Sequence, residues 1–473
     1  MKIYAPLLPV LSLLMVSAAP AIATAQTLSP QRASAELSAA SPAADRISAF
    51  TASDRAYGEA LLERLVNQNS GSLNLPGVRA VGEMMRAEFE ALGFAVNWVE
   101  GAAWGRAGHL IATHHPAMAS SDTRRRTASR RRGANTIAGK RILLIGHLDT
   151  VFEPSSPFQR YEVSTGGDRA TGPGVGDDKG GLVVIIQALR AMRATGTLDS
   201  ADIIVVLTGD EERVGDPVSS ARASLIAAGQ WADAALEYEN QISGPDGDFG
   251  TIARRSSSNW TLNVSARTGH SSTIFSDGMG YGAANEMARI LDTFRRELPE
   301  ANLTFNVGVM AAGTPAALDA DEESATASGK TNIVPQTAVA RGDLRTLTVE
   351  QDARIRAAMA AIVAAHLPGA EATIRFDDGY PPMSPTAGNR ALLALLNQAN
   401  RELGLPEMAE YDPARRGAAD SGFVAPYVDT LGGLGAVSSG AHAVGESINL
   451  ALLPRQAARS AHFITLLSQQ PRE

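Results

Sequence analysis

Three acidic residues stand side by side where a buried strand is expected to end. The run ADIIVVLT (201–208) is apolar and β-branched, as in a core strand, and GDEERVG (209–215) follows it. Adjacent carboxylates repel one another, so a plain chain reversal is better served by Gly, Asn or Ser. One interpretation is an exposed acidic loop. The other is that Asp210, Glu211 and Glu212 face cations held with the help of the rest of the chain.

Four other segments carry imidazole or carboxylate groups. Two are predicted strand ends: IGHLDTV (145–151) with His147 and Asp149, and AALEYEN (234–240) with Glu239. The others are a Gly-rich turn before a helix, GPGVGDDKGG (172–181) with Asp177, and a segment far downstream, SSGAHAVGE (438–446) with His442. Sites in open α/β sheets form beyond the carboxyl ends of the strands. We therefore expect these side chains to meet.

Two histidines and three carboxylates suit a pair of Zn²⁺ ions, because imidazole and carboxylate are both good zinc ligands. One carboxylate can bridge two metal ions. Glu211 would then be free to act as a base, with Glu212 as a ligand. Asp149, two residues after His147 on an extended segment, can hold the imidazole in one tautomer. Glu237 lies two residues before Glu239 on the same face and is the competing acid there.

The order of predicted elements indicates an α/β fold with an inserted domain. Strands alternating with helices predict a catalytic domain with a mostly parallel, two-sided sheet. From about residue 253 the order becomes β-α-β-β-α-β, a ferredoxin-like arrangement, and the first pattern resumes after GYPPM. The predicted divisions are a signal peptide (1–25), an Ala/Ser-rich leader (26–50), the large domain in two stretches (51–252 and 377–473), and between them an inserted domain (253–376); the family resemblance described below implies that the large domain is catalytic and that the inserted one is a dimerisation or lid domain.

The first residues and the overall composition predict an exported protein. Lys2, the apolar run LLPVLSLLMV and the small residues of AIATA are typical of a secretory signal peptide cut after Ala25, which predicts a periplasmic or secreted protein. The chain has no Cys, so disulfides are excluded. Its net charge of −8 gives no reason to expect nucleic acid, and nothing else indicates a membrane. The insertion 116–140, with Arg124–Arg126 and Arg130–Arg132, is interpreted as an exposed hairpin insertion or a basic docking patch.

Taken together, six segments resemble a known enzyme family. They occur in the expected order: GHLDTV, GPGVGDDKGG, GDEERVG, ARTGHSS, TNIVPQTAVARGDLR and GAHAVGE. This series resembles the zinc-dependent metallopeptidases that include glutamate carboxypeptidase, aminoacylase and acetylornithine deacetylase. The likeness covers roughly residues 55 to 470, and LLERLVNQNSGSLN and EALGFAV are most similar to the bacterial glutamate carboxypeptidase branch.

The resemblance implies a role for each matched residue. His147, Asp177 and Glu239 would hold one zinc, and Asp177, Glu212 and His442 the other. Glu211 would be the general base and acid, and Asp149 would orient His147. His270 would reach an active site across a homodimer and stabilise the oxyanion. Asn332 and Arg345 would hold the free carboxylate of the substrate, with Arg341 as a nearby competitor.

The predicted activity is hydrolysis of the amide bond to a C-terminal amino acid, or of an N-acyl amino acid, in a small substrate with a free carboxylate. A dipeptidase or an N-deacetylase with the same metals is the alternative, and Co²⁺ or Mn²⁺ could replace Zn²⁺. A non-catalytic binding module would have lost ligands, and no matched position is lost. Asp178 departs from the family, which more often has an apolar residue there, so it would either perturb metal affinity or point to solvent.

Overall fold

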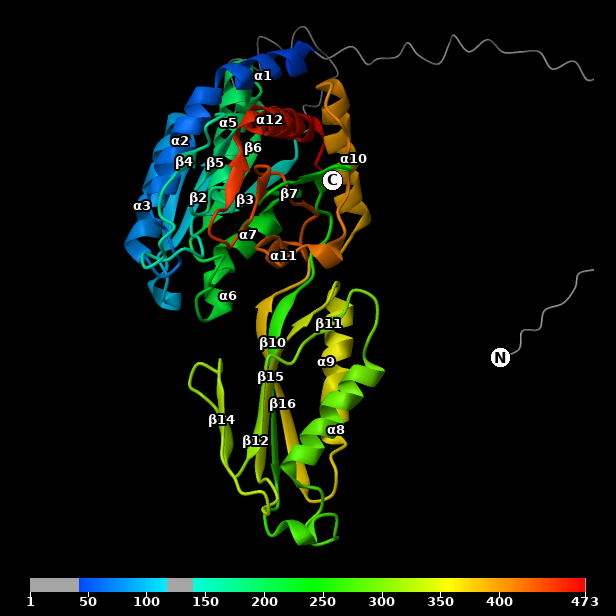
Figure 1. Ribbon diagram of the computed structural model, residues 1–473. Helices are drawn as coiled ribbons and strands as arrows, with labels where there is room; N and C mark the ends of the chain where they lie inside the picture. Colours follow the sequence, from blue (N-terminus) through cyan, green and yellow to red (C-terminus); the bar gives the residue numbers. More distant parts are fainter. Residues whose placement is uncertain (1–41, 117–138, 473) are drawn as a thin grey trace, which may run out of the picture. The chain divides into compact units, whose positions relative to one another are not determined.

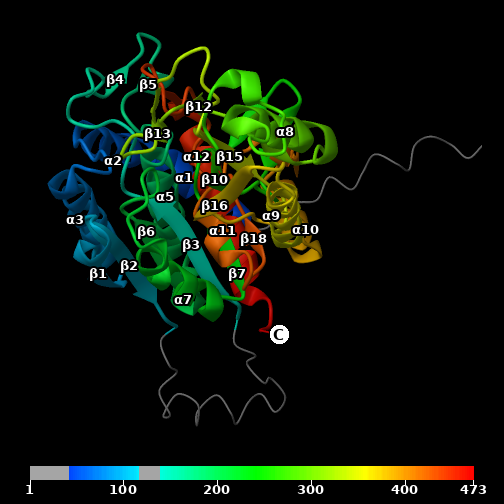
Figure 2. The ribbon, with the colours of Figure 1, turned by 90° about the horizontal axis from the view of Figure 1, so that it is seen from below.

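A mixed sheet with a parallel centre carries the predicted strand ends. The computed structural model describes residues 42–116 and 139–472, and within these residues the largest sheet has six strands. In sheet order they are β1 (Ala95–Glu100), β2 (Gly108–His114), β6 (Asp202–Thr208), β3 (Arg141–His147), β7 (Ala234–Glu237) and β18 (Thr430–Leu431) (Figures 1 and 2). β6, β3, β7 and β18 pair in parallel, and β2 is antiparallel to both neighbours. The mostly parallel sheet is confirmed.

Both faces of this sheet are covered, because alternate residues of its strands enter different cores. Ile142 and Leu144 of β3 belong to the larger core, whereas Leu143 and Ile145 belong to a smaller one. The larger core includes residues from α1 (Pro42–Ser53), α2 (Arg55–Asn67), α3 (Leu75–Ala91), α5 (Lys179–Thr195), α10 (Ala387–Glu402) and α12 (Leu453–Gln469). The smaller core includes residues from α7 (Ala223–Trp231) and α11 (Ser421–Val424), and Val218 of α6 (Val218–Ala221) packs against it.

The ordered chain begins earlier than the sequence suggested. The predicted leader extended to residue 50, but α1 already begins at Pro42. Ala44 and Ile47 are buried, and Ile47 joins the larger core. The Ala/Ser-rich composition hid these two contacts, which make residues 42–50 part of the fold. The predicted signal peptide and nearly all of the Arg-rich insertion lie outside the described residues.

Two smaller sheets complete this region of the chain. One has β17 (Met408–Glu410), β9 (Gly247–Gly250) and β8 (Ile242–Gly244), and the other has β19 (Ser438–Ser439), β20 (Ser447–Asn449), β5 (Arg169–Thr171) and β4 (Glu162–Val163). The second brings residues 438–449 beside the segment that leads to the turn of Asp177. Over residues 42–116 and 139–472, no helix is both long and apolar enough to cross a membrane.

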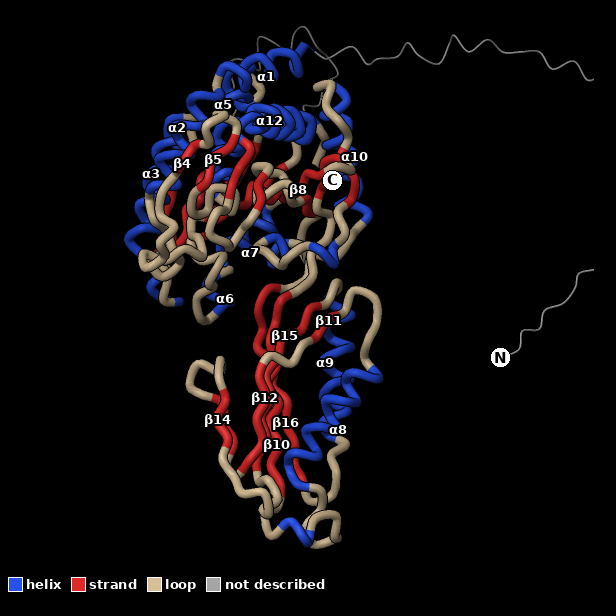
Figure 3. Tube along the Cα trace, viewed as in Figure 1, coloured by secondary structure: helices blue, strands red, loops and turns tan. Residues whose placement is uncertain are grey.

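Residues 257–380, here called the inserted segment, build an antiparallel sheet of their own. Its elements are β10 (Ser257–Ala266), α8 (Gly282–Glu297), β11 (Thr304–Phe305), β12 (Val309–Gly313), β13 (Ala316–Leu318), β14 (Ala325–Ala327), β15 (Thr337–Arg345), α9 (Val349–Ala364) and β16 (Ala370–Tyr380). β10 lies between β15 and β16, and α8 and α9 pack on one face around a separate core (Figure 3).

The predicted β-α-β-β-α-β order of this segment is present, with one addition. The second expected strand is split into β11 and β12, and the hairpin of β13 and β14 was not predicted. Its strands have the sequences AAL and ATA, which are short and rich in alanine, so they lack the alternation of apolar and polar residues that indicates a strand. The division of the chain into domains at 253 and 376 stays a prediction.

Candidate metal centre

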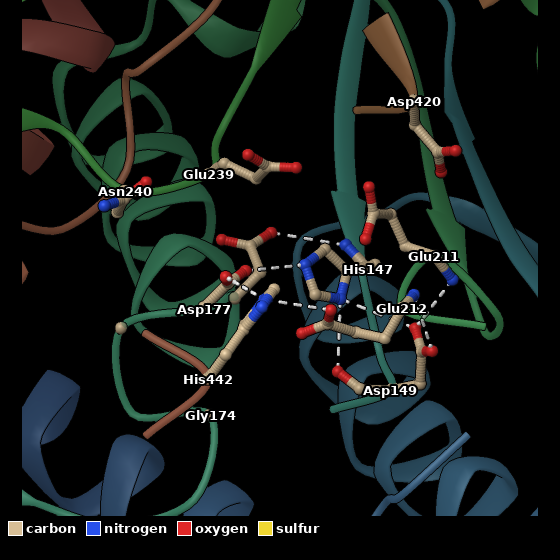
Figure 4. Close-up of polar contacts among 12 residues, drawn as sticks. His147, Asp149, Gly174, Asp177, Glu211, Glu212, Glu239, Asn240, Asp420 and His442 are labelled. Carbon is tan, nitrogen blue, oxygen red and sulfur yellow. Dashed lines mark hydrogen bonds and ion pairs between the residues drawn. The ribbon is translucent and has the colours of Figure 1, made fainter. Parts of the chain in front are cut away.

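Three neighbouring strand ends and two turns bring the predicted ligands together. His147 is the last residue of β3, Glu211 and Glu212 follow β6, and Glu239 follows β7. These strands are adjacent and parallel, so their carboxyl ends lie at one edge of the sheet. Asp177 comes from the turn before α5, and His442 from the turn between β19 and β20. Figure 4 shows the six side chains around a common centre.

Asp177 lies between the two histidines and offers one carboxylate oxygen to each. Its Oδ1 lies 3.0 Å from Nε2 of His147, and its Oδ2 lies 3.2 Å from Nε2 of His442. Nε2 of His442 is also 3.0 Å from Oε2 of Glu212. His442 adopts a φ of 65°, a conformation that non-glycine residues rarely occupy and that is frequent at functional sites. A carboxylate shared in this way suits the predicted bridging ligand.

Two overlapping groups of side chains have the geometry to hold a metal ion. In each group the donor atoms lie within 4.8 Å of one another, and the groups are His147, Asp177 and Glu212, and His147, Glu211 and Glu239. The donors are imidazole nitrogen and carboxylate oxygen, the set that suits Zn²⁺ and other divalent metals. The residues therefore fit a metal centre. Glu211, predicted as the base, stands within reach of the same position as Glu239.

Asp149 fixes both His147 and the acidic segment. Nδ1 of His147 lies 3.1 Å from the Asp149 carbonyl oxygen and 3.4 Å from its carboxylate. The same carboxylate accepts hydrogen bonds from the backbone N–H groups of Glu211 (3.0 Å) and Glu212 (3.1 Å), and from the Ser72 hydroxyl (2.6 Å). Asp149 thus lies beside His147, with its backbone carbonyl nearer the imidazole than its carboxylate, and its orienting role stays a prediction. Its contact with residues 211 and 212 was not foreseen.

The electrostatics of the centre favour binding of cations. Burial raises the pKa of the Glu211 carboxyl well above its ordinary value, and Glu239 adds to the shift. Burial likewise raises the pKa of Glu239 to about 7. Hydrogen bonds to Asp177 and Glu212 raise the pKa of His442 to about 10. Desolvated carboxylates so close together hold protons strongly, and a metal ion would compete with those protons for the same oxygens.

Glu237 and Glu239, the two acids that compete as the predicted ligand, differ in their hydrogen-bond partners. Both oxygens of Glu237 are engaged, Oε2 by the buried Arg254 (2.9 and 2.5 Å) and Oε1 by the Ser421 backbone N–H (3.1 Å). Glu239 gives only Oε2 to Arg254, at 2.7 Å, and belongs to a metal-capable group. Its Oε1 accepts no hydrogen bond among the described residues, so Glu239 is the better candidate ligand.

The backbone of the turn that carries Asp177 is fixed by the carboxylate of Glu446, a residue that the sequence did not single out. Its Oε1 accepts hydrogen bonds from the backbone N–H groups of Gly176 (2.7 Å) and Asp177 (2.9 Å), and its Oε2 from that of Gly174 (3.2 Å).

Asp178 is fully buried and accepts from the His147 backbone N–H at 3.2 Å. Burial raises the pKa of Asp178 well above its ordinary value. Of its two expected orientations, the one toward solvent is wrong.

The predicted residues of the inserted segment lie at two ends of its sheet. His270 and Asn332 are exposed neighbours, since the Ser271 backbone N–H donates to the Asn332 carbonyl at 2.9 Å. They lie beyond the end of β10 and before the start of β15. Arg345 ends β15, where its Nε lies 3.2 Å from Asp343. Arg341 is occupied by Thr261, Asp377 and Glu322, which favours Arg345 as the freer cation.

The sequence of the chain matches one family model over most of its length. The model for peptidase family M20/M25/M40 matches residues 143–466, which include every candidate metal ligand. The chain belongs to this family. The predicted family is therefore confirmed, and the chain is an enzyme of the metallopeptidase and amidohydrolase class.

Individual M20 relatives agree with this assignment. Carboxypeptidase G2 of Pseudomonas sp. (strain RS-16) is 26% identical over 429 residues, which cover 85% of this chain and 87% of the relative. The solved aminopeptidase PepT of Bacillus cereus has a TM-score of 0.65 at 17% identity and covers 87% of this chain and 98% of its own. The YXEP protein of Bacillus subtilis, a dinuclear metal binding peptidase, has a TM-score of 0.58 at 13% identity, with coverages of 89% and 99%. The two structures support the fold.

Proposed function

We propose that the protein is a zinc-dependent hydrolase that releases a C-terminal amino acid, or cleaves an N-acyl amino acid, with a free carboxylate on the substrate. One observation carries the proposal: Asp177 presents one oxygen to each of two histidines, and further carboxylates lie on either side. That arrangement suits two metal ions per subunit, held by His147, Asp177 and Glu239 and by Asp177, Glu212 and His442. Bound zinc ions would polarise the amide carbonyl and acidify water.

Glu211 is the proposed general base and acid. Its backbone N–H donates to the Asp149 carboxylate at 3.0 Å, which fixes the main chain from which its side chain extends. Burial raises the pKa of the Glu211 carboxyl well above its ordinary value, and such a carboxylate can both accept and return a proton. Glu211 takes a proton from the attacking water as the oxygen adds to the amide carbon. It delivers that proton to the nitrogen as the C–N bond breaks.

His270 is the proposed hydrogen-bond donor to the developing oxyanion. Its Nδ1 accepts from the Ser272 backbone N–H at 3.2 Å, and a backbone N–H can only donate. In the neutral ring the proton therefore lies on Nε2, at the exposed end of the side chain. That tautomer can donate to an oxyanion, the interaction that usually contributes most in such reactions.

The position of Arg345 supports a homodimer. Asn332 and Arg345 are separated by all of β15, about 27 Å at 3.4 Å per residue, so one chain cannot bring both to one substrate carboxylate. The end of the inserted segment that carries His270 and Asn332, between β10 and β15, is here called the tip. In the proposed site Arg345 comes from the subunit that binds the metals, and His270 and Asn332 come from the tip of the other subunit. The guanidinium fork of Arg345 would select substrates with a free carboxylate.

The test is hydrolysis of a panel of N-acyl amino acids and short peptides by the zinc-loaded protein, each substrate with a free and an amidated C-terminus. Glu211→Gln is assayed alongside. Activity that requires the free carboxylate and disappears in the variant supports the proposal. Equal cleavage of amidated substrates, or release from the N-terminal end alone, would instead support an aminopeptidase or a dipeptidase.

We also propose that the protein is periplasmic or secreted after removal of residues 1–25. The support is the signal-peptide pattern in their sequence. These residues lie outside the part of the chain that the structure describes. Mass spectrometry of the N-terminus of the exported protein tests this, and an uncut Met1 in a cytoplasmic fraction would contradict it.

A further inference from the structure

The backbone of the acidic segment is held at each residue from Gly209 to Glu212. Three backbone N–H groups donate: that of Gly209 to His109 Nδ1 (3.1 Å), and those of Glu211 and Glu212 to the Asp149 carboxylate. Two backbone carbonyls accept: that of Asp210 from Arg222 Nη2 (3.1 Å), and that of Glu211 from the Tyr380 hydroxyl. Each of these hydrogen bonds constrains the path of the backbone from which the Glu211 side chain extends. The direction of the Glu211 side chain therefore depends on all of these partners.

Arg222 explains the first of the three acids. It is completely buried, with Nη1 2.5 Å from Asp210 Oδ1 and Nε 2.7 Å from Asp420 Oδ1. Its Nη2 donates to the Tyr380 hydroxyl at 3.1 Å. Asp210 is thus neutralised by a guanidinium and leaves the metal centre to Glu211 and Glu212. The Tyr380 hydroxyl accepts from Arg222 and uses its own hydrogen for the Glu211 carbonyl.

Tyr380 comes from a different region of the chain than the other partners. It is the last residue of β16, so among the contacts of the described residues it is the one tie between the inserted segment and the backbone of residues 209–212. Its ring packs against Phe423 of α11, with centroids 5.3 Å apart. Burial and the nearby Glu211 raise the pKa of the phenol well above its ordinary value, which keeps it a hydrogen-bond donor.

We propose that Tyr380 is a positioning residue, through which the root of the inserted segment sets the placement of Glu211. The inference rests on the proposed role of Glu211 as general base. β16 pairs with β10 along nearly its whole length, so Tyr380 moves with the inserted sheet. A displacement of that sheet would reach the base through a single hydrogen bond to the Glu211 carbonyl.

The test is Tyr380→Phe, which keeps the ring on Phe423 and removes only the hydroxyl. We expect kcat to fall about 10- to 100-fold, since a misplacement near 1 Å can cost that much, while KM and the content of bound zinc change little. Amide hydrogen exchange of residues 209–215 should be faster. Tyr57→Phe is the matched control, because it likewise removes one donating hydroxyl: Tyr57 of α2 donates to the buried carboxylate of Glu88 in α3, away from the centre, whereas Tyr380 donates to a backbone carbonyl.

Several results would overturn this proposal. A Tyr380→Phe enzyme with the kcat and exchange of Tyr57→Phe would show that the hydroxyl does not position the base. A Tyr380→Phe protein that does not fold would assign the residue to stability instead. Glu211→Gln separates the two levels: if it keeps wild-type turnover, the proposed function fails, and if it is inactive while Tyr380→Phe is normal, only the positioning role fails.

Discussion

The ligand cluster at the ends of β3, β6 and β7 and the tip of the inserted segment differ in how far their side chains are engaged. His147 is 1% exposed, and both of its nitrogens face oxygens of Asp149 or Asp177. His270 is exposed, and its polar contacts among the described residues are with the adjacent turn, residues 271–273. The cluster is assembled within one chain, whereas Nε2 of His270 has no hydrogen-bond partner among the described residues.

The residues of the candidate site should therefore fall into two classes. Changes of the proposed metal ligands in the cluster, as distinct from the proposed base Glu211, should alter metal binding and folding stability together with activity, because these side chains contact one another. Changes at the tip should alter activity alone, because few contacts of the folded chain depend on them.

The greatest loss of activity is expected for Glu211→Gln. General acid and base catalysis contributes about 10²- to 10⁴-fold, so kcat should fall by that amount while the fold is retained. The matched variant is Glu237→Gln, an acid nearby that is occupied by Arg254 and proposed not to bind metal. Steady-state kinetics and zinc content give the comparison. A Glu211→Gln enzyme near wild-type kcat would contradict the role of the base.

His270→Ala tests the tip. We expect kcat to fall about 10²- to 10³-fold, the usual cost of losing one oxyanion donor, with unchanged zinc content and melting temperature. His109→Ala is the contrasting variant, because His109 is buried against Gly209 and Ala221 and should lower the melting temperature. Loss of zinc in His270→Ala would show that the two classes are not distinct.

Arg345→Lys should act mainly on substrate recognition. Lysine keeps the charge but loses the fork, and a hydrogen bond to a charged group contributes about 1.5–3 kcal/mol, so kcat/KM should fall about 10- to 100-fold. The preference for free over amidated substrates should shrink by a similar factor. An unchanged preference would show that another group reads the carboxylate.

Removal of the metals with a chelator should destabilise the protein more at higher pH. The pKa of Glu239 is raised from 4.5 to about 7 in the folded protein, so over that range the folded state binds more protons than the unfolded state and loses stability as pH rises. His442, raised from 6.5 to about 10, has the same sign at higher pH. Metal ions replace these protons. Thermal unfolding should show a gap between loaded and stripped protein that widens by several degrees from about pH 5.5 to about pH 8.5, and a constant gap would contradict this.

Much of the cluster could be predicted because its residues lie at strand ends or in short motifs of recognisable type. The types of His147, Asp177, Glu212 and His442, with their order along the chain, were enough to place them together. Tyr380 and Arg222 could not be found in this way. Tyr380 is 169 residues from Glu211 along the chain, and Arg222 is 12 residues from Asp210 and 198 from Asp420. A tyrosine at the end of a strand also has many structural uses. The start of α1 was missed because alanine-rich segments reveal little about burial.

The central claim is that one active site joins the cluster of one subunit to the tip of another. The most direct measurement mixes Glu211→Gln and His270→Ala chains under conditions in which dimers exchange. Each hybrid dimer would contain one site with an intact cluster and an intact tip. We predict that activity rises well above that of either variant alone. Hybrid dimers that form, as shown by differently tagged chains, but stay as inactive as the separate variants would contradict the account.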